Sequence, residues 1–176
     1  LSEDQQVAFG RCFGELDAFP FGKPGKNPYI LEILHNAYSP GTENSWHTDV
    51  TWMECPSLGL IAQCTQVPPY GGDTLWTNLA AAYNGLSETM RGIVDGLRGI
   101  HVFGSNEGVK TTDKYDDTLE RRRMISEHPL VTVHPETGEK VLYVSPTYVK
   151  SIVGLKPRES QKILEMLWEH SVRPEY

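Results

Sequence analysis

The residues most suited to metal chemistry lie in the segment 46–52, which reads WHTDVTW. His47 and Asp49 stand two residues apart there, among aromatic and β-branched side chains that favour a strand. Side chains alternate between the two faces of a strand, so His47 and Asp49 would share one face. An imidazole nitrogen and a carboxylate oxygen placed in this way can bind one metal ion at adjacent positions. With a distant second histidine, they would complete the triad of non-haem Fe(II) sites, which leaves positions open for a cosubstrate and oxygen.

A His-x-Asp pair is weak evidence by itself, because so short a motif occurs often by chance. The alternative is a hydrogen-bonded histidine and aspartate on a solvated strand face. The surrounding sequence has to decide between the two interpretations.

Mixed helices and strands are expected around this segment. Helices are predicted from Ser2, which with Gln5 forms a capping box, to Gly14, then from Ser87 to Leu97, and over 156–170, where Pro157 opens the helix. Strands are predicted at 29–34, 57–65, 74–78 and 99–103, with a hairpin over 130–144 around a Pro-Glu-Thr-Gly turn. The polar loop 104–123 is typical of a lid over a site. We find no repeat and no linker, so a single domain over 1–176 is expected.

The composition excludes several classes of function. A net charge of −7 argues against nucleic-acid and anionic-membrane partners, which favour basic patches. No apolar run is long enough to span a bilayer. The cysteines, Cys12, Cys55 and Cys64, are odd in number, widely spaced and set in apolar surroundings, which predicts buried free thiols and a cytoplasmic location.

Longer segments of the sequence resemble those of a known family. They are NSWHTDVTW, VPPYGGDTLWTNLAAAYNGLSE, GLRGIHVF, VTVHPETGEKVLYVSPTYVKSIVGL and SVRPEY. In content, order and spacing the chain resembles the taurine dioxygenase (TauD/TfdA) family of Fe(II)- and 2-oxoglutarate-dependent dioxygenases. This resemblance implies a mainly β fold with flanking helices, a double-stranded β-helix or cupin-like jelly roll.

The resemblance also assigns roles. It implies that His47 and Asp49 are iron ligands and that Thr74 binds the distal carboxylate of the cosubstrate 2-oxoglutarate. Without the family, Thr74 would be read as a β-branched residue that begins a strand.

For the organic substrate, the resemblance points to Asn44, Phe19 and Tyr148. Phe19 stands where the taurine enzymes carry a histidine, and with Phe21 it is interpreted equally well as loop packing. The substrate is therefore expected to be a small organic acid, a sulfonate such as taurine, an alkyl sulfate ester or a related compound.

The family's third iron ligand, a histidine, and the arginine that pairs with 2-oxoglutarate are expected beyond the last residue of this chain. The chain is therefore expected to be truncated at both ends. The later histidines His128, His134 and His170 are better interpreted as surface or structural groups than as ligands.

The implied activity is hydroxylation of the organic acid by O2, with release of succinate and CO2, in a homo-oligomer. Two alternatives stay open. One is another metal-dependent enzyme, such as a zinc hydrolase that uses the same histidine and aspartate. The other is a catalytically silent jelly-roll binding module.

Overall fold

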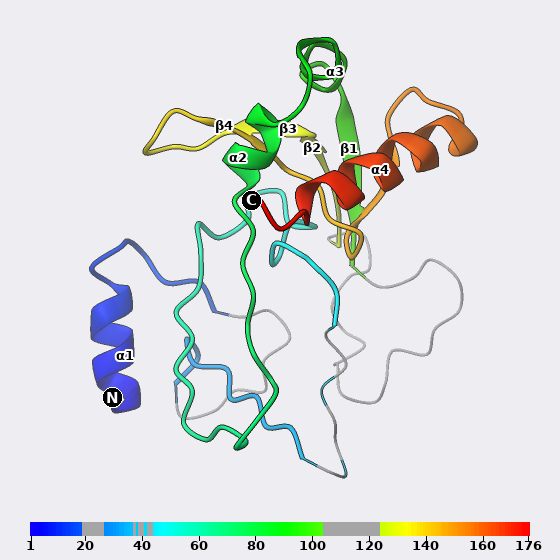
Figure 1. The fold of residues 1–176 in the computed structure, drawn as a ribbon. Helices are drawn as coiled ribbons and strands as arrows, with labels where there is room; N and C mark the ends of the chain where they lie inside the picture. Colours follow the sequence, from blue (N-terminus) through cyan, green and yellow to red (C-terminus); the bar gives the residue numbers. More distant parts are fainter. Residues whose placement is uncertain (19–26, 37, 39–40, 42–43, 104–123) are drawn as a thin grey trace. The chain divides into compact units, whose positions relative to one another are not determined.

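The computed structural model describes residues 1–18, 27–36, 38, 41, 44–103 and 124–176 (Figure 1). These residues belong to two compact units. The first comprises Leu1–Asn44, Ser57–Asp73 and Thr111–Asp117, and the second comprises Ser45–Pro56, Thr74–Lys110 and Thr118–Tyr176. Each unit is described by itself below. The single domain over 1–176 stays a prediction, and the expected lid 104–123 lies outside the described residues.

In the first unit, helix α1 (Glu3–Gly10) begins as the sequence predicts. The Gln5 amide donates to Ser2 Oγ over 3.3 Å, and the Ser2 amide donates to Gln5 Oε1 over 2.9 Å, which completes the capping box. The helix ends at Gly10, four residues before the predicted end at Gly14.

The strands predicted at 29–34 and 57–65 are not formed among the described residues. Large apolar side chains in both segments are exposed, for example Ile33 at 67% and Leu58 at 69%. Alternating apolar residues make a strand only when a neighbouring strand supplies its backbone hydrogen bonds. These segments lack such a neighbour in the described part of the chain.

The second unit holds the sheets and most of the core (Figure 1). Strand β1 (Arg98–Val102) lies between β2 (Ile125–Pro129) and β5 (Val149–Ile152), antiparallel to both. The hairpin of β3 (Val131–Val133) and β4 (Lys140–Leu142) forms a second antiparallel sheet. The predicted strand at 99–103 and the hairpin are thus confirmed, whereas β2 and β5 were not predicted.

Three helices cover these sheets: α2 (Leu79–Asn84), α3 (Glu88–Val94) and α4 (Pro157–Ser171). Helix α4 packs against β5 and α2, and α2 packs against β4. The predicted helices at α3 and α4 are confirmed, with Ser87 capping the first and Pro157 opening the second. The shared apolar core includes Ala82, Val94, Leu130, Leu142, Val149, Leu164 and Leu167.

The antiparallel sheets and flanking helices agree with the predicted fold class in part. Helices hold more of the described residues than strands do, and four segments predicted as strands, at 29–34, 46–52, 57–65 and 74–78, are not formed. The described strands form two small sheets, so the closed jelly roll stays a prediction.

Two other expectations can be compared with the structure. Cys12, Cys55 and Cys64 are free, as predicted, but all three are exposed. The prediction of burial was wrong. No helix in the described ranges has the length and apolar character needed to cross a membrane.

Candidate metal site

The segment that carries His47 and Asp49 is a turn and not the predicted strand. Residues 46–48 have no regular structure, and the Met53 amide donates to the Val50 carbonyl over 2.9 Å to close a turn. Val50 has a φ of 51°, in the left-handed region that β-branched residues rarely adopt. The chain therefore bends directly after Asp49, which overturns the argument that His47 and Asp49 share a strand face.

The two side chains nevertheless come together. His47 Nε2 lies 3.2 Å from Asp49 Oδ1, with the side chains 25% and 47% exposed, respectively. Each keeps an open side towards solvent, so a small ligand could reach both atoms. The structure thus places the two predicted side chains next to each other, although they do not lie on a strand.

The other ring nitrogen of His47 is held by the backbone. His47 Nδ1 lies 2.8 Å from the Ser45 carbonyl oxygen. A carbonyl only accepts hydrogen bonds, so Nδ1 carries a proton. Nε2, the nitrogen that faces Asp49, is then the ring nitrogen left to bind a metal ion. A backbone carbonyl on the distal nitrogen is the usual way in which proteins orient a metal-binding histidine.

The spacing of the two donor atoms fits a metal ion. Imidazole nitrogens and carboxylate oxygens bind divalent ions such as zinc at ~2.1 Å, so two of them at right angles stand roughly 3 Å apart. The observed 3.2 Å is close to that value. A nitrogen and an oxygen donor also suit Fe(II), which accepts both ligand types. The residues present therefore fit two adjacent positions of an iron site.

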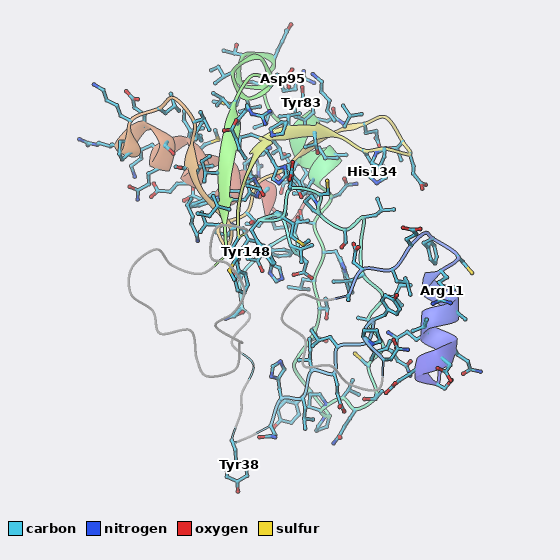
Figure 2. All side chains as sticks on the ribbon, turned by 180° about the vertical axis from the view of Figure 1, so that it is seen from behind. Arg11, Tyr38, Tyr83, Asp95, His134 and Tyr148 are labelled. Carbon is cyan, nitrogen blue, oxygen red and sulfur yellow. The ribbon has the colours of Figure 1, made fainter. Side chains whose placement is uncertain are left out.

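A loop directly before strand β5 contacts the segment that carries His47. Thr147 Oγ1 lies 2.7 Å from Ser45 Oγ and donates to the Trp46 carbonyl over 3.4 Å. The Tyr148 ring meets the His47 ring edge-on, with centroids 6.1 Å apart. Figure 2 shows Tyr148 far from Tyr83 and Asp95, beside the end of β1 at Val102, whose amide donates to the Tyr148 carbonyl.

Side chains of strand β2 contact the backbone carbonyls at the C-terminal end of this turn. Ser126 Oγ donates to the Trp52 carbonyl over 2.8 Å, and His128 Nε2 lies 2.9 Å from the Met53 carbonyl. His128 is thus engaged by the backbone, in agreement with its interpretation as a structural group.

Behind the turn lies a buried group of rings. His101 is 1% exposed, packs 5.1 Å from the His128 ring and stacks 5.4 Å from Tyr143. Neither nitrogen of His101 has a hydrogen-bond partner in the described part of the chain. Burial, with a smaller contribution from nearby His128, lowers the pKa of His101 to about 4. Burial also raises the pKa of Tyr143 to about 12, so both groups are neutral around pH 7.

The remaining predicted site residues are less informative. Thr74 and Asn44 are exposed and lie outside helices and strands, so the strand predicted at 74–78 is not formed. Asn78, predicted as the end of that strand, instead caps helix α2 through its side-chain oxygen. Phe19 and Phe21 lie outside the described residues. The roles of Thr74, Asn44, Phe19 and Tyr148 remain predictions.

The two other late histidines contact the backbone. His134 Nδ1 accepts from the Glu136 and Thr137 amides in the hairpin turn, and His170 Nε2 lies 2.8 Å from the Ala82 carbonyl. Among the residues that the structure describes, no group of three or more His, Cys, Asp or Glu side chains is placed to hold a metal. The described chain thus offers the pair His47 and Asp49.

Sequence reasoning missed Ser45, Ser126 and Thr147. Ser45 and Thr147 stand inside the words that carried the resemblance, but their contacts join segments about 100 residues apart. No pattern in a single sequence reports such a pairing.

Comparison with known proteins identifies the family. The model of the taurine catabolism dioxygenase TauD, TfdA family matches residues 1–176. An alpha-ketoglutarate-dependent sulfate ester dioxygenase from Pseudomonas putida is 36% identical over 99% of this chain and 60% of its own length. An alpha-ketoglutarate-dependent sulfonate dioxygenase from Saccharomyces cerevisiae is 30% identical over 94% of this chain and 42% of its own length.

A solved structure from Burkholderia xenovorans, described as a "putative alpha-ketoglutarate-dependent taurine dioxygenase", is also similar. It is 46% identical, with a TM-score of 0.74, over 100% of this chain and 59% of that protein. The chain belongs to the TauD/TfdA family. It spans about 60% or less of the length of these relatives.

Proposed function

We propose that this chain forms part of an Fe(II)- and 2-oxoglutarate-dependent dioxygenase that acts on a small organic acid. The observation that carries the proposal is the pairing of His47 Nε2 with Asp49 Oδ1 at 3.2 Å, in a chain of the TauD/TfdA family. The hydrogen bond of His47 Nδ1 to the Ser45 carbonyl adds support, since it leaves Nε2 on the side of the carboxylate.

His47 and Asp49 would hold the iron at two adjacent positions. Bound Fe(II), with 2-oxoglutarate and O2, would supply the oxidation of a C–H bond and release succinate and CO2. The part of the protein is to bind the substrate in a fixed orientation and to exclude water. The third histidine and the arginine expected from the resemblance stay predictions, as does the jelly roll that would bring them to the pair.

Thr74 would hold the distal carboxylate of 2-oxoglutarate through its hydroxyl. A hydrogen bond to a carboxylate is roughly twice as strong as one between neutral groups. The exposed hydroxyl of Thr74 is accessible for this role in the described structure, and the assignment itself comes from the family resemblance.

The organic substrate would be a sulfonate or a sulfate ester. The similar proteins named above act, by their names, on sulfate esters, sulfonates and taurine. We place Asn44, Phe19 and Tyr148 among the substrate-binding residues. Tyr148 has the best structural support, because its ring contacts His47. A homo-oligomer and a cytoplasmic location stay predictions.

Anaerobic titration of the full-length protein with Fe(II) and 2-oxoglutarate would test the proposal. We expect the weak visible absorption band that forms when 2-oxoglutarate chelates Fe(II), followed on aeration by succinate formation that depends on an added sulfonate or alkyl sulfate. A hydrolytic product formed with Zn²⁺ and without O2 would favour a zinc hydrolase. Ligand binding without turnover would favour a silent binding module, and either result would contradict the dioxygenase proposal.

A further inference from the structure

The hydroxyl groups around His47 form a directed chain of hydrogen bonds. The Trp46 carbonyl can only accept, so the Thr147 hydroxyl proton points to it over 3.4 Å. Ser45 Oγ, 2.7 Å from Thr147 Oγ1, must then be the donor in that shorter bond. Thr147 thus contacts the Ser45 side chain and the Trp46 carbonyl, on either side of the Ser45–Trp46 peptide, whose carbonyl oxygen, on Ser45, accepts from His47 Nδ1.

The loop that carries Thr147 is itself anchored. The buried residue Ser145 accepts from the Tyr148 amide through Oγ over 3.3 Å and from the Val149 amide through its carbonyl over 3.1 Å. The Val102 amide of β1 donates to the Tyr148 carbonyl over 2.9 Å. Thr147 therefore stands on a segment fixed to the sheet, whereas residues 44–48 have no regular structure of their own.

We propose that Thr147 is a positioning residue, which sets the ring orientation of His47 through Ser45 and so prepares Nε2 to bind a metal. Thr147 has no contact with His47 Nε2 or Asp49 in the structure, so it acts through the backbone that holds the ring. The edge-on contact of the adjacent Tyr148 ring with His47 limits rotation of the imidazole from the same loop.

The metal-binding part of this inference rests on the proposed function, and the ring-orientation part does not. Loss of a group that orients a metal-binding histidine typically weakens metal affinity 10- to 100-fold. Without the Thr147 hydroxyl, the Ser45 carbonyl is free to turn, and the His47 Nδ1 proton loses its fixed acceptor.

The first test is NMR of the Nδ1 proton of His47 in metal-free, full-length protein. We expect this proton to exchange slowly with solvent in the wild type, because the Ser45 carbonyl holds it, and faster in Thr147→Val. Thr147→Ser keeps the hydroxyl and should restore slow exchange. Thr132→Val makes the same chemical change on strand β3 and should leave His47 unaltered. An unchanged exchange rate in Thr147→Val would overturn the proposal.

Ser45→Ala gives a second, independent variant in an exposed segment, in case Thr147→Val does not fold. It should speed exchange of the His47 Nδ1 proton as Thr147→Val does, and the double variant should add little, because both substitutions remove one shared bond. Full additivity of the two effects would contradict a common route.

The second test is anaerobic titration of the same variants with Fe(II) or, as a spectroscopic substitute, Co(II). We expect Thr147→Val to bind the ion about tenfold more weakly than Thr132→Val does. Equal affinities would overturn the role of Thr147 in metal binding. Failure of the wild type itself to bind either ion would refute the proposed function, while the proton-exchange measurement would still support or overturn the positioning of His47.

Discussion

His47 Nε2 and Asp49 Oδ1 lie 3.2 Å apart, directly before a turn. Val50, the first residue of that turn, has a positive φ. The pair is therefore presented by a bend and not by the pleat of a strand. His47 owes its direction to the Ser45 carbonyl. A substitution that disturbs this carbonyl should therefore affect His47 and leave the Asp49 carboxylate in place.

Asp49→Ala should abolish 2-oxoglutarate turnover and the absorption band of the Fe(II) complex. It removes a direct donor atom, so the Fe(II) affinity should fall by more than the roughly 100-fold seen when an orienting group is lost. Isothermal titration with Fe(II) under anaerobic conditions measures the change. Asp73→Ala is the matched control, an exposed aspartate whose loss should leave the affinity unaltered. Normal turnover in Asp49→Ala would rule out the metal site.

Thr74→Val should raise the 2-oxoglutarate requirement and leave Fe(II) binding intact. Loss of one hydrogen bond to a charged group costs about 1.5–3 kcal/mol. That energy corresponds to roughly a ten- to hundredfold change in affinity. Steady-state kinetics at varied 2-oxoglutarate provides the measurement, with Thr132→Val as control. An unchanged requirement would remove Thr74 from the cosubstrate site.

His101 should make the protein less stable in acid. Its pKa is about 4 in the folded state and 6.5 in the unfolded state, so the unfolded chain binds more protons between these values. Stability is therefore fully present above about pH 6.5 and falls as the pH drops towards 4, by a total of about 3 kcal/mol. Urea unfolding at a series of pH values measures this loss.

His101→Leu should reduce that pH dependence, because the buried ring that resists protonation is gone. His35→Leu, which replaces an exposed histidine of the first unit, should keep the acid-induced loss. The same slope of stability against pH in His101→Leu as in the wild type would show that other groups cause it.

Val50→Gly should cost less stability than Val141→Gly, although both valines are half-buried. A β-branched residue in the left-handed region carries strain of about 1–3 kcal/mol, which glycine relieves. Val141 lies in strand β4, where glycine only removes packing and adds backbone entropy to the unfolded chain. Chemical denaturation of the two variants gives the comparison, and an equal or larger loss at position 50 would show that the turn is unstrained.

Local signals in the sequence predicted much of the second unit. Ser87 and Pro157 mark helix starts that depend only on neighbouring residues, and the Pro-Glu-Thr-Gly turn lies within its own hairpin. The strands predicted at 57–65 and 74–78 failed because pairing depends on a distant partner that alternation does not reveal.

The candidate site shows the same difference between local signals, which the sequence reveals, and contacts between distant segments, which it does not. The identity of the pair, His47 and Asp49, followed from residue type and spacing, and the family was identified from longer words. The reason given for their proximity was wrong, since the φ of Val50 is a property of the folded backbone that the word WHTDVTW does not encode locally. The contacts of Ser126 and Thr147 with this segment span 74 and about 100 residues, respectively, and only the tertiary structure brings them together.

The hydrogen bond between Ser45 and Thr147 has a consequence for the order of folding. It closes a loop across 102 residues, and closing so long a loop costs roughly 4 kcal/mol of chain entropy, more than the roughly 1 kcal/mol that one hydrogen bond returns. The bond can therefore form only after β1, β2 and β5 have assembled and brought the two segments together. His47, the proposed iron ligand, would acquire its orientation late in folding. We therefore expect Fe(II) to bind the folded protein and to have little influence on the folding rate.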